Sequence, residues 1–299
     1  RDMAQMRIVN EQLKEAAPAL RKLATDHHRP QTRLQTLCTL QGLDALDAAF
    51  LRGPLNDKHP GVRAAAVRLL EPFIAKVCPD GGPLLGMRED SDAAVRLQLA
   101  LSTGEWVFRG GGHLLMRLAA EDSDDPFLVA AVLSSLNETN VESAVNGLLV
   151  QPARPSPKAN VLAGVLATAI GLEASAAVTT ATKKILERDS NGRLAEWQLQ
   201  SLVVLLDELA RQQKFIEAAV DESAKDQAAT DVNDNVKTLS IELLGRQTRP
   251  SEADYKLIAS GLSPNRSAEM QSSAVDALTR TSQVQAAEIM LENWNSHGP

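Results

Sequence analysis

Asp57-Lys-His-Pro-Gly-Val-Arg-Ala-Ala-Ala-Val-Arg-Leu-Leu-Glu71 is the stretch that decides the fold of this 299-residue chain. It predicts a helix that begins at Pro60, because proline suits the first helical position and Asp57 can accept hydrogen bonds from amides left free at a helix start. The apolar residues that follow at helical spacing form one stripe: Val62, Ala66, Leu69, Leu70 and Phe73. Such a stripe must be buried against a neighbour, so further helices are expected beside this one.

Degraded copies of this stretch recur along the chain. Aligned on the basic residue Arg63, they place five residues at the equivalent position: Arg33, Arg96, Val129, Lys237 and Gln271. The copies lie 30, 33, 33 and 34 residues apart, and the interval of 108 between positions 129 and 237 has room for three weaker units. Fixed periods of this length are typical of solenoids. We therefore predict an all-α fold, an α-α superhelix of about nine helix pairs, with residues 1–299 as one solenoid.

The apolar periodicity predicts helices throughout and no strand. The expected helices span residues 2–13, 15–26, 32–43, 46–56, 60–76, 84–89, 93–107, 113–120, 126–136, 141–150, 158–172, 174–188, 194–211, 215–229, 232–245, 251–261, 268–281 and 284–294. Ser251 is expected to cap the helix that follows it. The Pro-rich segment 151–157 is expected to be an irregular loop. Because the chain opens on Arg1-Asp2 inside a helical pattern without an initiator methionine, we interpret it as a piece of a longer protein.

Composition limits the classes of function. Aromatic residues make up only 3% of the chain and apolar residues 44%, which suits close packing of small aliphatic side chains between helices. The net charge of −7 argues against a surface that follows nucleic-acid phosphates. Cys38 and Cys78 form no metal or haem-attachment motif and are interpreted as small buried residues. No apolar run is long enough for a membrane span, and the longest, Val161 to Leu172, contains Gly164.

Three short motifs imitate ligand sites, and each has a simpler structural interpretation. Asp231, Asn233, Asn235 and Glu242 have the spacing of a calcium loop, but Val236 stands where the sharp turn needs glycine, so a capped helix start is favoured. Gly110-Gly-Gly-His113 lacks the residues that complete a phosphate or metal loop and is interpreted as a flexible connector. His27-His28 is expected to lie solvated in a turn.

The acidic run Glu121-Asp-Ser-Asp-Asp125 precedes Pro126. It is expected to supply carboxylates at a helix start, where the helix dipole favours negative charge. An acidic patch that binds a partner is the alternative.

The period, with Asp-x-x-Pro-x-Val-Arg at 57–63, resembles HEAT repeats, which form right-handed α-α superhelices. Four segments are more specifically similar to the HEAT segment of large planctomycete and verrucomicrobial proteins: 33–46, 59–72, 95–105 and 131–136. Those proteins are often described as membrane-bound dehydrogenases, with a β-propeller before the HEAT segment and a c-type cytochrome domain after it. The resemblance implies a location in the cell envelope or periplasm.

This chain departs from that family in lacking C-x-x-C-H and any propeller-like pattern. We therefore expect no cofactor, no catalytic residue and no metal-binding residue within this chain. In HEAT proteins the recurring basic residue pairs with acidic loop residues of neighbouring units. The resemblance therefore implies a structural ladder, with six members: Asp57, Arg63, Asp90, Arg96, Arg33 and Lys237.

The predicted function is a non-catalytic scaffold or spacer between protein domains, with other domains of the parent chain or a protein partner as its ligands. Three alternatives stay open. A free-standing peptide-binding module requires an exposed groove of polar and apolar side chains along the inner helices. A HEAT-fold DNA glycosylase requires a basic face with aromatic residues. A domain that takes part in electron transfer requires haem ligands, which a haem absorbance spectrum would reveal.

Overall fold

The computed structural model describes residues 2–77, 82–106, 110–149, 159–211, 228, 233–247, 250–281 and 284–291. All regular structure in these residues is helical and none is strand, which confirms the all-helical part of the prediction. The chain forms two compact units, Arg1–Leu148 and Leu149–Pro299. Much of the expected helix 215–229 and the whole expected loop 151–157 lie outside the described residues. A single solenoid over 1–299 stays a prediction.

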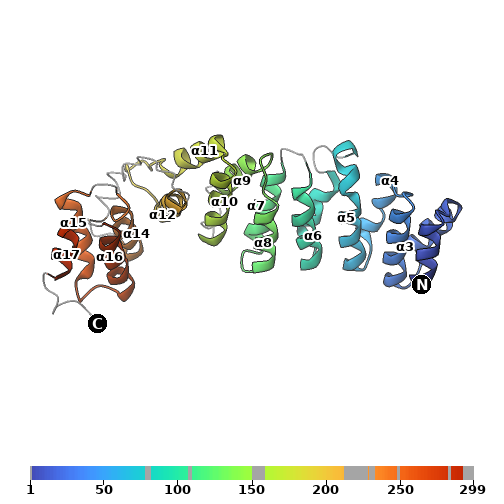
Figure 1. The fold of residues 1–299 in the computed structure, drawn as a ribbon, viewed down its shortest axis with the longest axis horizontal. Coiled ribbons are helices and arrows are strands. Elements are labelled where there is room, and N and C mark those ends of the chain that lie inside the picture. Colours follow the sequence, from blue (N-terminus) through green and yellow to red (C-terminus); the bar gives the residue numbers. More distant parts are fainter. Residues whose placement is uncertain are drawn as a thin grey trace. The chain divides into compact units, whose positions relative to one another are not determined.

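Unit 1 contains the helices around the organising stretch (Figure 1). In chain order they are α1 (Asp2–Asn10), η1 (Lys14–Ala16), α2 (Ala17–Asp26), α3 (Pro30–Gly42), α4 (Ala48–Leu51), η2 (Pro54–Asn56), α5 (Pro60–Val77), η3 (Gly82–Glu89), α6 (Ala93–Gly104), α7 (Gly111–Glu121), α8 (Pro126–Ser134) and α9 (Val141–Leu149). The helices that carry the recurring stretch pack in sequence: α3 contacts α5, α5 contacts α6, and α6 contacts α8. Helix α4 packs on α5, and η3 and α7 pack on α6.

Unit 2 is built from α10 (Ala159–Gly171), α11 (Ser175–Ile185), α12 (Glu196–Arg211), α14 (Asp234–Leu244), α15 (Glu252–Ala259), η4 (Ser260–Leu262), α16 (Ala268–Arg280) and α17 (Val284–Leu291). Here α10 contacts α12, α12 contacts α14, and α14 contacts α16, while α11, α15 and α17 pack beside them. Ser251 caps α15 in a capping box with Asp254, as expected from the sequence.

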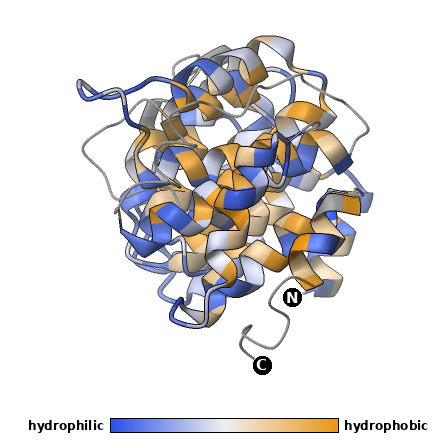
Figure 2. Cartoon of the chain, turned by 90° about the vertical axis from the view of Figure 1, so that its left-hand side faces the viewer, coloured by the Kyte–Doolittle hydropathy of each residue, from blue (hydrophilic) through white to orange (hydrophobic). Residues whose placement is uncertain are grey.

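The apolar stripes lie where helices meet. On α5, Val62, Ala66, Leu69 and Leu70 are all buried, whereas Phe73 of the predicted stripe is only half-buried. The equivalent residues on the next helices, Val95 and Leu128, are 0% and 2% exposed. The helices carry both apolar and polar residues, and several connecting turns are polar (Figure 2). Helices α5, α6 and α8 therefore bury an apolar side against their neighbours.

Two expected elements differ in the structure. The helix expected over 46–56 is instead the single turn α4 followed by the 3₁₀ turn η2. Asp47 is the N-cap of α4 and accepts a hydrogen bond from the amide of Phe50, and Pro54 has no amide hydrogen with which to continue the helix. The expected break at Gly110-Gly-Gly112 is also wrong for its last two residues: Gly111 and Gly112 are buried in the first turn of α7.

Candidate functional site

A series of arginine–aspartate ion pairs links successive helices of unit 1, and we call it the ladder: Arg33–Asp57, Arg63–Asp90 and Arg96–Asp122. Arg33 donates from Nε and Nη2 to the two carboxylate oxygens of Asp57, at 2.6 and 2.5 Å. Arg63 binds Asp90 in the same way, at 2.7 and 2.6 Å. Arg96 Nε donates to Asp122 Oδ2 at 2.5 Å. Two of the three pairs are thus bidentate, the geometry in which guanidinium and carboxylate bind most strongly.

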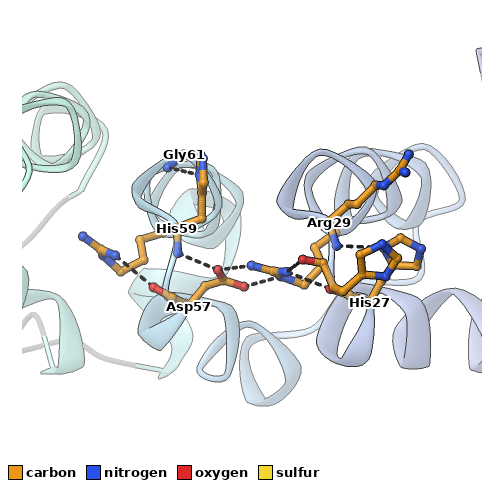
Figure 3. A network of polar contacts seen from close by, with 8 residues as sticks. His27, Arg29, Asp57, His59 and Gly61 are labelled. Atoms are coloured by element: carbon orange, nitrogen blue, oxygen red, sulfur yellow. Dashed lines mark hydrogen bonds and ion pairs between the residues drawn. The ribbon is translucent and has the colours of Figure 1, made fainter.

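The third nitrogen of each arginine binds the main chain six residues earlier. Arg33 Nη1 donates to the carbonyl of His27 at 2.7 Å, and Arg63 Nη1 donates to the carbonyl of Asp57 at 2.9 Å. Arg96 Nη1 donates to the carbonyl of Asp90 at 2.6 Å. Asp57 is consequently held from both sides, by its carboxylate and by its carbonyl (Figure 3). The ladder is one continuous polar network from α3 to the segment that precedes α8.

Histidines complete two of the turns in this network (Figure 3). The amide of His59 donates to Asp57 Oδ1 at 2.8 Å, and the amide of Gly61 donates to His59 Nδ1 at 3.1 Å. At the preceding turn the amide of Arg29 donates to His27 Nδ1 at 3.1 Å, and the ring of His27 stacks on that of His28, with centroids 4.5 Å apart. Both turns use side-chain acceptors for amides that a helix start leaves free.

Two pairs of the ladder, Arg33–Asp57 and Arg63–Asp90, change the acidity of their members. Burial opposes the charge of Asp57, but hydrogen bonds from Arg33 and from the amide of His59 outweigh it, so the pKa of Asp57 lies below its ordinary value. The hydrogen bonds from Arg63 lower the pKa of Asp90, with burial acting in the opposite direction. The guanidinium pKa values of Arg33 and Arg63 are raised, first of all by hydrogen bonds to their aspartates. The Arg33–Asp57 and Arg63–Asp90 pairs are therefore fully charged at neutral pH.

These shifts predict loss of stability in acid. A carboxyl group with a lowered pKa in the folded state stabilises that state above its unfolded pKa, and this contribution disappears as the pH falls through the folded value. The free energy of unfolding measured with urea is expected to decrease between about pH 5 and pH 3, since an unfolded aspartate titrates near 3.9. The Asp57→Asn/Asp90→Asn variant should show a smaller decrease than the unmodified chain. An equal decrease in both proteins would contradict this assignment.

The ladder does not continue at the remaining copies of the recurring position. Val129 takes that position in α8 and has no charge to pair. Lys237 on α14 is buried, but within the described part of the chain it forms no ion pair. Unit 2 has a different charged group: Arg246 donates to both carboxylate oxygens of Asp207, at 2.9 and 2.7 Å, and Arg280 adds a bond of 2.9 Å. This group links α12, the turn after α14 and the end of α16, in place of the expected Lys237 rung.

Asp122 is the ladder residue that the sequence reasoning missed. In the sequence, Asp122 is part of the acidic run 121–125, which is expected to supply carboxylates at a helix start. Asp125 does so: its Oδ1 accepts hydrogen bonds from the amides of Phe127 and Leu128. The spacing carried the missing signal, because Asp57, Asp90 and Asp122 follow their arginines by 24, 27 and 26 residues. Asp122 and Asp125 are occupied by intramolecular contacts, which weakens the alternative of a partner-binding patch at these two residues.

A groove with a volume of about 450 Å³ lies across α5, α6 and the end of α8, and we call it the α5–α6–α8 groove. Its lining is mainly polar: Arg68, Glu71, Gln98, Leu101, Gly104, Glu105, Ser134, Ser135, Leu136 and Asn137. Ser102 donates to Glu71 Oε1 at 2.5 Å and ties α5 to α6. Asn137 Nδ2 donates to the carbonyl of Gly104 at 2.9 Å and ties the end of α8 to the end of α6.

Gly104 allows the close approach at the floor of the groove. A Cβ atom at this position would lie 3.0 Å from the Cα of Ser135, so α6 and α8 meet here almost backbone to backbone. Above this floor, Arg68 and Glu105 are exposed, and neither forms an ion pair with any described residue. Leu101, also in the lining, is 44% exposed. The groove thus presents one apolar side chain and two charges that have no ion-pair partner among the described residues.

The other motifs do not form ligand sites among the described residues. Asn233 caps α14 by accepting a hydrogen bond from the amide of Asn235, whereas Asp231 lies outside the described range. Cys38 is a free, half-buried thiol, and Cys78 is also outside that range. The described residues include no group of three or more histidine, cysteine or acidic side chains arranged to hold a metal ion. No helix among them has both the length and the apolar character needed to cross a bilayer.

Comparison with known proteins adds no further constraint. No protein-family model matches this chain, and a search of the curated proteins finds no match. The geometry of the ladder and of the groove is therefore the basis for proposing a function.

Proposed function

We propose that this chain is a non-catalytic scaffold of stacked helix pairs, a HEAT-like solenoid, that binds an extended segment of another polypeptide in the α5–α6–α8 groove. The groove carries the proposal, because it is lined by residues of α5, α6 and the end of α8 and exposes polar and apolar groups together. Peptide recognition needs such a combination, since main-chain and charged groups require polar partners while side chains require apolar contact.

The ladder supports the same proposal by keeping the groove helices in register. Arg63 and Asp90 join the start of α5 to the start of α6, and Glu71 and Ser102 join the two helices nearer their other ends. Side chains on rigid elements bind more precisely than those on loops, because less conformational entropy is lost on binding. A role as a scaffold needs this rigidity.

The partner is either another domain of the parent chain or a separate protein. The resemblance to the HEAT segment of planctomycete dehydrogenases favours the first, with a propeller and a cytochrome domain as the flanking neighbours in the cell envelope. That context is part of the proposal.

Selection from a phage-displayed library of random 12-residue peptides tests peptide binding by the purified chain. We expect enriched peptides whose binding is lost in Ser134→Tyr, which places a ring over the groove from an exposed position. Ser272→Tyr is the matched control, because Ser272 is an exposed helical residue of unit 2 outside the groove. Failure to enrich any peptide, or equal binding to both variants, would overturn the proposal.

A further inference from the structure

The contacts between α5 and α6 show that these helices run in the same direction. Arg63 near the start of α5 binds Asp90 just before α6, and Glu71 in the second half of α5 binds Ser102 in the second half of α6. The second contact joins residues 31 positions apart. In this register Arg68 is level with the helical turn that holds Gln98 and Leu101, and Glu105 lies about six residues, roughly 9 Å, further along the axis.

The groove consequently carries a positive charge on α5 and a negative charge at the end of α6. Arg68, on α5, has no ion-pair partner among the described residues and is exposed. Glu105 directly follows the last residue of α6, Gly104, where the helix dipole adds partial negative charge. Glu71 lies on α5 three residues after Arg68, and one of its carboxylate oxygens is bound to Ser102.

The separation of these charges sets the spacing of a complementary ligand. Packed helices lie about 8–10 Å apart, and six helical residues add about 9 Å along the axis, so the backbones of Arg68 and Glu105 are offset by roughly 13 Å. An extended chain advances about 3.3 Å per residue, so this offset corresponds to about four residues. Free amino acids and other small zwitterions carry their charges much closer together, and they match the groove poorly.

We infer that the α5–α6–α8 groove recognises an extended segment of a partner polypeptide in which an acidic and a basic side chain are about four residues apart. The acidic side chain pairs with Arg68. The basic side chain pairs with Glu105, and its aliphatic stem lies over Leu101, which is 44% exposed. This inference rests on the proposed function and adds the chemistry of the partner.

The order of the two charges provides the test. Peptides selected by the unmodified chain are expected to share an acidic and a basic residue at this spacing, in one order along the peptide. The charge-swapped variant Arg68→Glu/Glu105→Arg should select the same spacing with the order reversed. Arg52→Glu/Glu142→Lys is the matched control, because both residues are exposed in unit 1 and lie outside the groove lining, and it should select the original order.

Fluorescence polarisation with one selected peptide gives the size of the effect. Replacing its basic residue by alanine should weaken binding by about three- to tenfold at 0.1 M salt, as expected for a partly exposed ion pair. Peptides that bind in the groove, as shown by loss in Ser134→Tyr, but carry no such charge pair would overturn this inference and leave the proposed function standing. Preferential binding of a small zwitterion such as free lysine would also overturn it. Failure to select any peptide would overturn both this inference and the proposed function.

Discussion

Replacing Asp90 by alanine is expected to lower the free energy of unfolding by about 3 kcal/mol, because it leaves a largely buried guanidinium without its counter-charge. The Arg63 side chain is 14% exposed and that of Asp90 is 8% exposed, so water can replace little of the lost interaction. Asp90 also accepts a hydrogen bond from the amide of Asp92 at the start of α6, and this contact is lost as well. Urea unfolding followed by circular dichroism measures the effect.

Asp122→Ala is the matched control for this variant. Asp122 is 27% exposed and binds Arg96 through a single nitrogen, so its removal should cost only about 1 kcal/mol. In a double-mutant cycle, Arg63→Met combined with Asp90→Ala should cost clearly less than the sum of the two single changes. Equal losses for Asp90→Ala and Asp122→Ala, or strict additivity in the cycle, would show that the ladder does not act through the Arg63–Asp90 pair.

Gly112→Ala is expected to destabilise the chain by about 2–3 kcal/mol, although alanine is the better helix former by about 1 kcal/mol. A Cβ atom at position 112 would lie 2.2 Å from the carbonyl oxygen of Asn140 and 2.3 Å from the amide nitrogen of Ala144. Both atoms are backbone, so α7 and its neighbour α9 must move apart. The Gly112 amide would then also lose its hydrogen bond to Ser143 Oγ. The same urea titration measures this change.

Gly86→Ala separates this steric effect from the general effect of replacing glycine. A Cβ atom at position 86 meets no atom within 4 Å, so this variant should be neutral or more stable by up to about 1 kcal/mol. A stabilised Gly112→Ala variant would mean that α7 and α9 do not pack as closely as described.

The local pattern of the sequence was sufficient to predict where most of the described helices lie and where several of them begin. Apolar spacing correctly placed α5, with Val62 and Leu69 buried, because a residue on an amphipathic helix can be assigned to a face without knowing its neighbour. The cap at Ser251 was predictable for a similar reason, since it satisfies amides within the same turn. The recurrence of Arg33, Arg63 and Arg96 singled out the arginines that the structure places in the ladder.

Features that join separate helices were less accessible from the sequence. Gly112 resembled a flexible connector because its own neighbours are glycines, and only its contact with α9 explains why a side chain is excluded. In the sequence, Asp122 is one of several equivalent carboxylates, and only its hydrogen bond from Arg96 in the folded chain distinguishes it. The α5–α6–α8 groove likewise combines residues from three helices. Local periodicity is sufficient to assign a helix and its buried face, whereas close approaches, ion-pair partners and grooves depend on distances between segments that are remote in the chain.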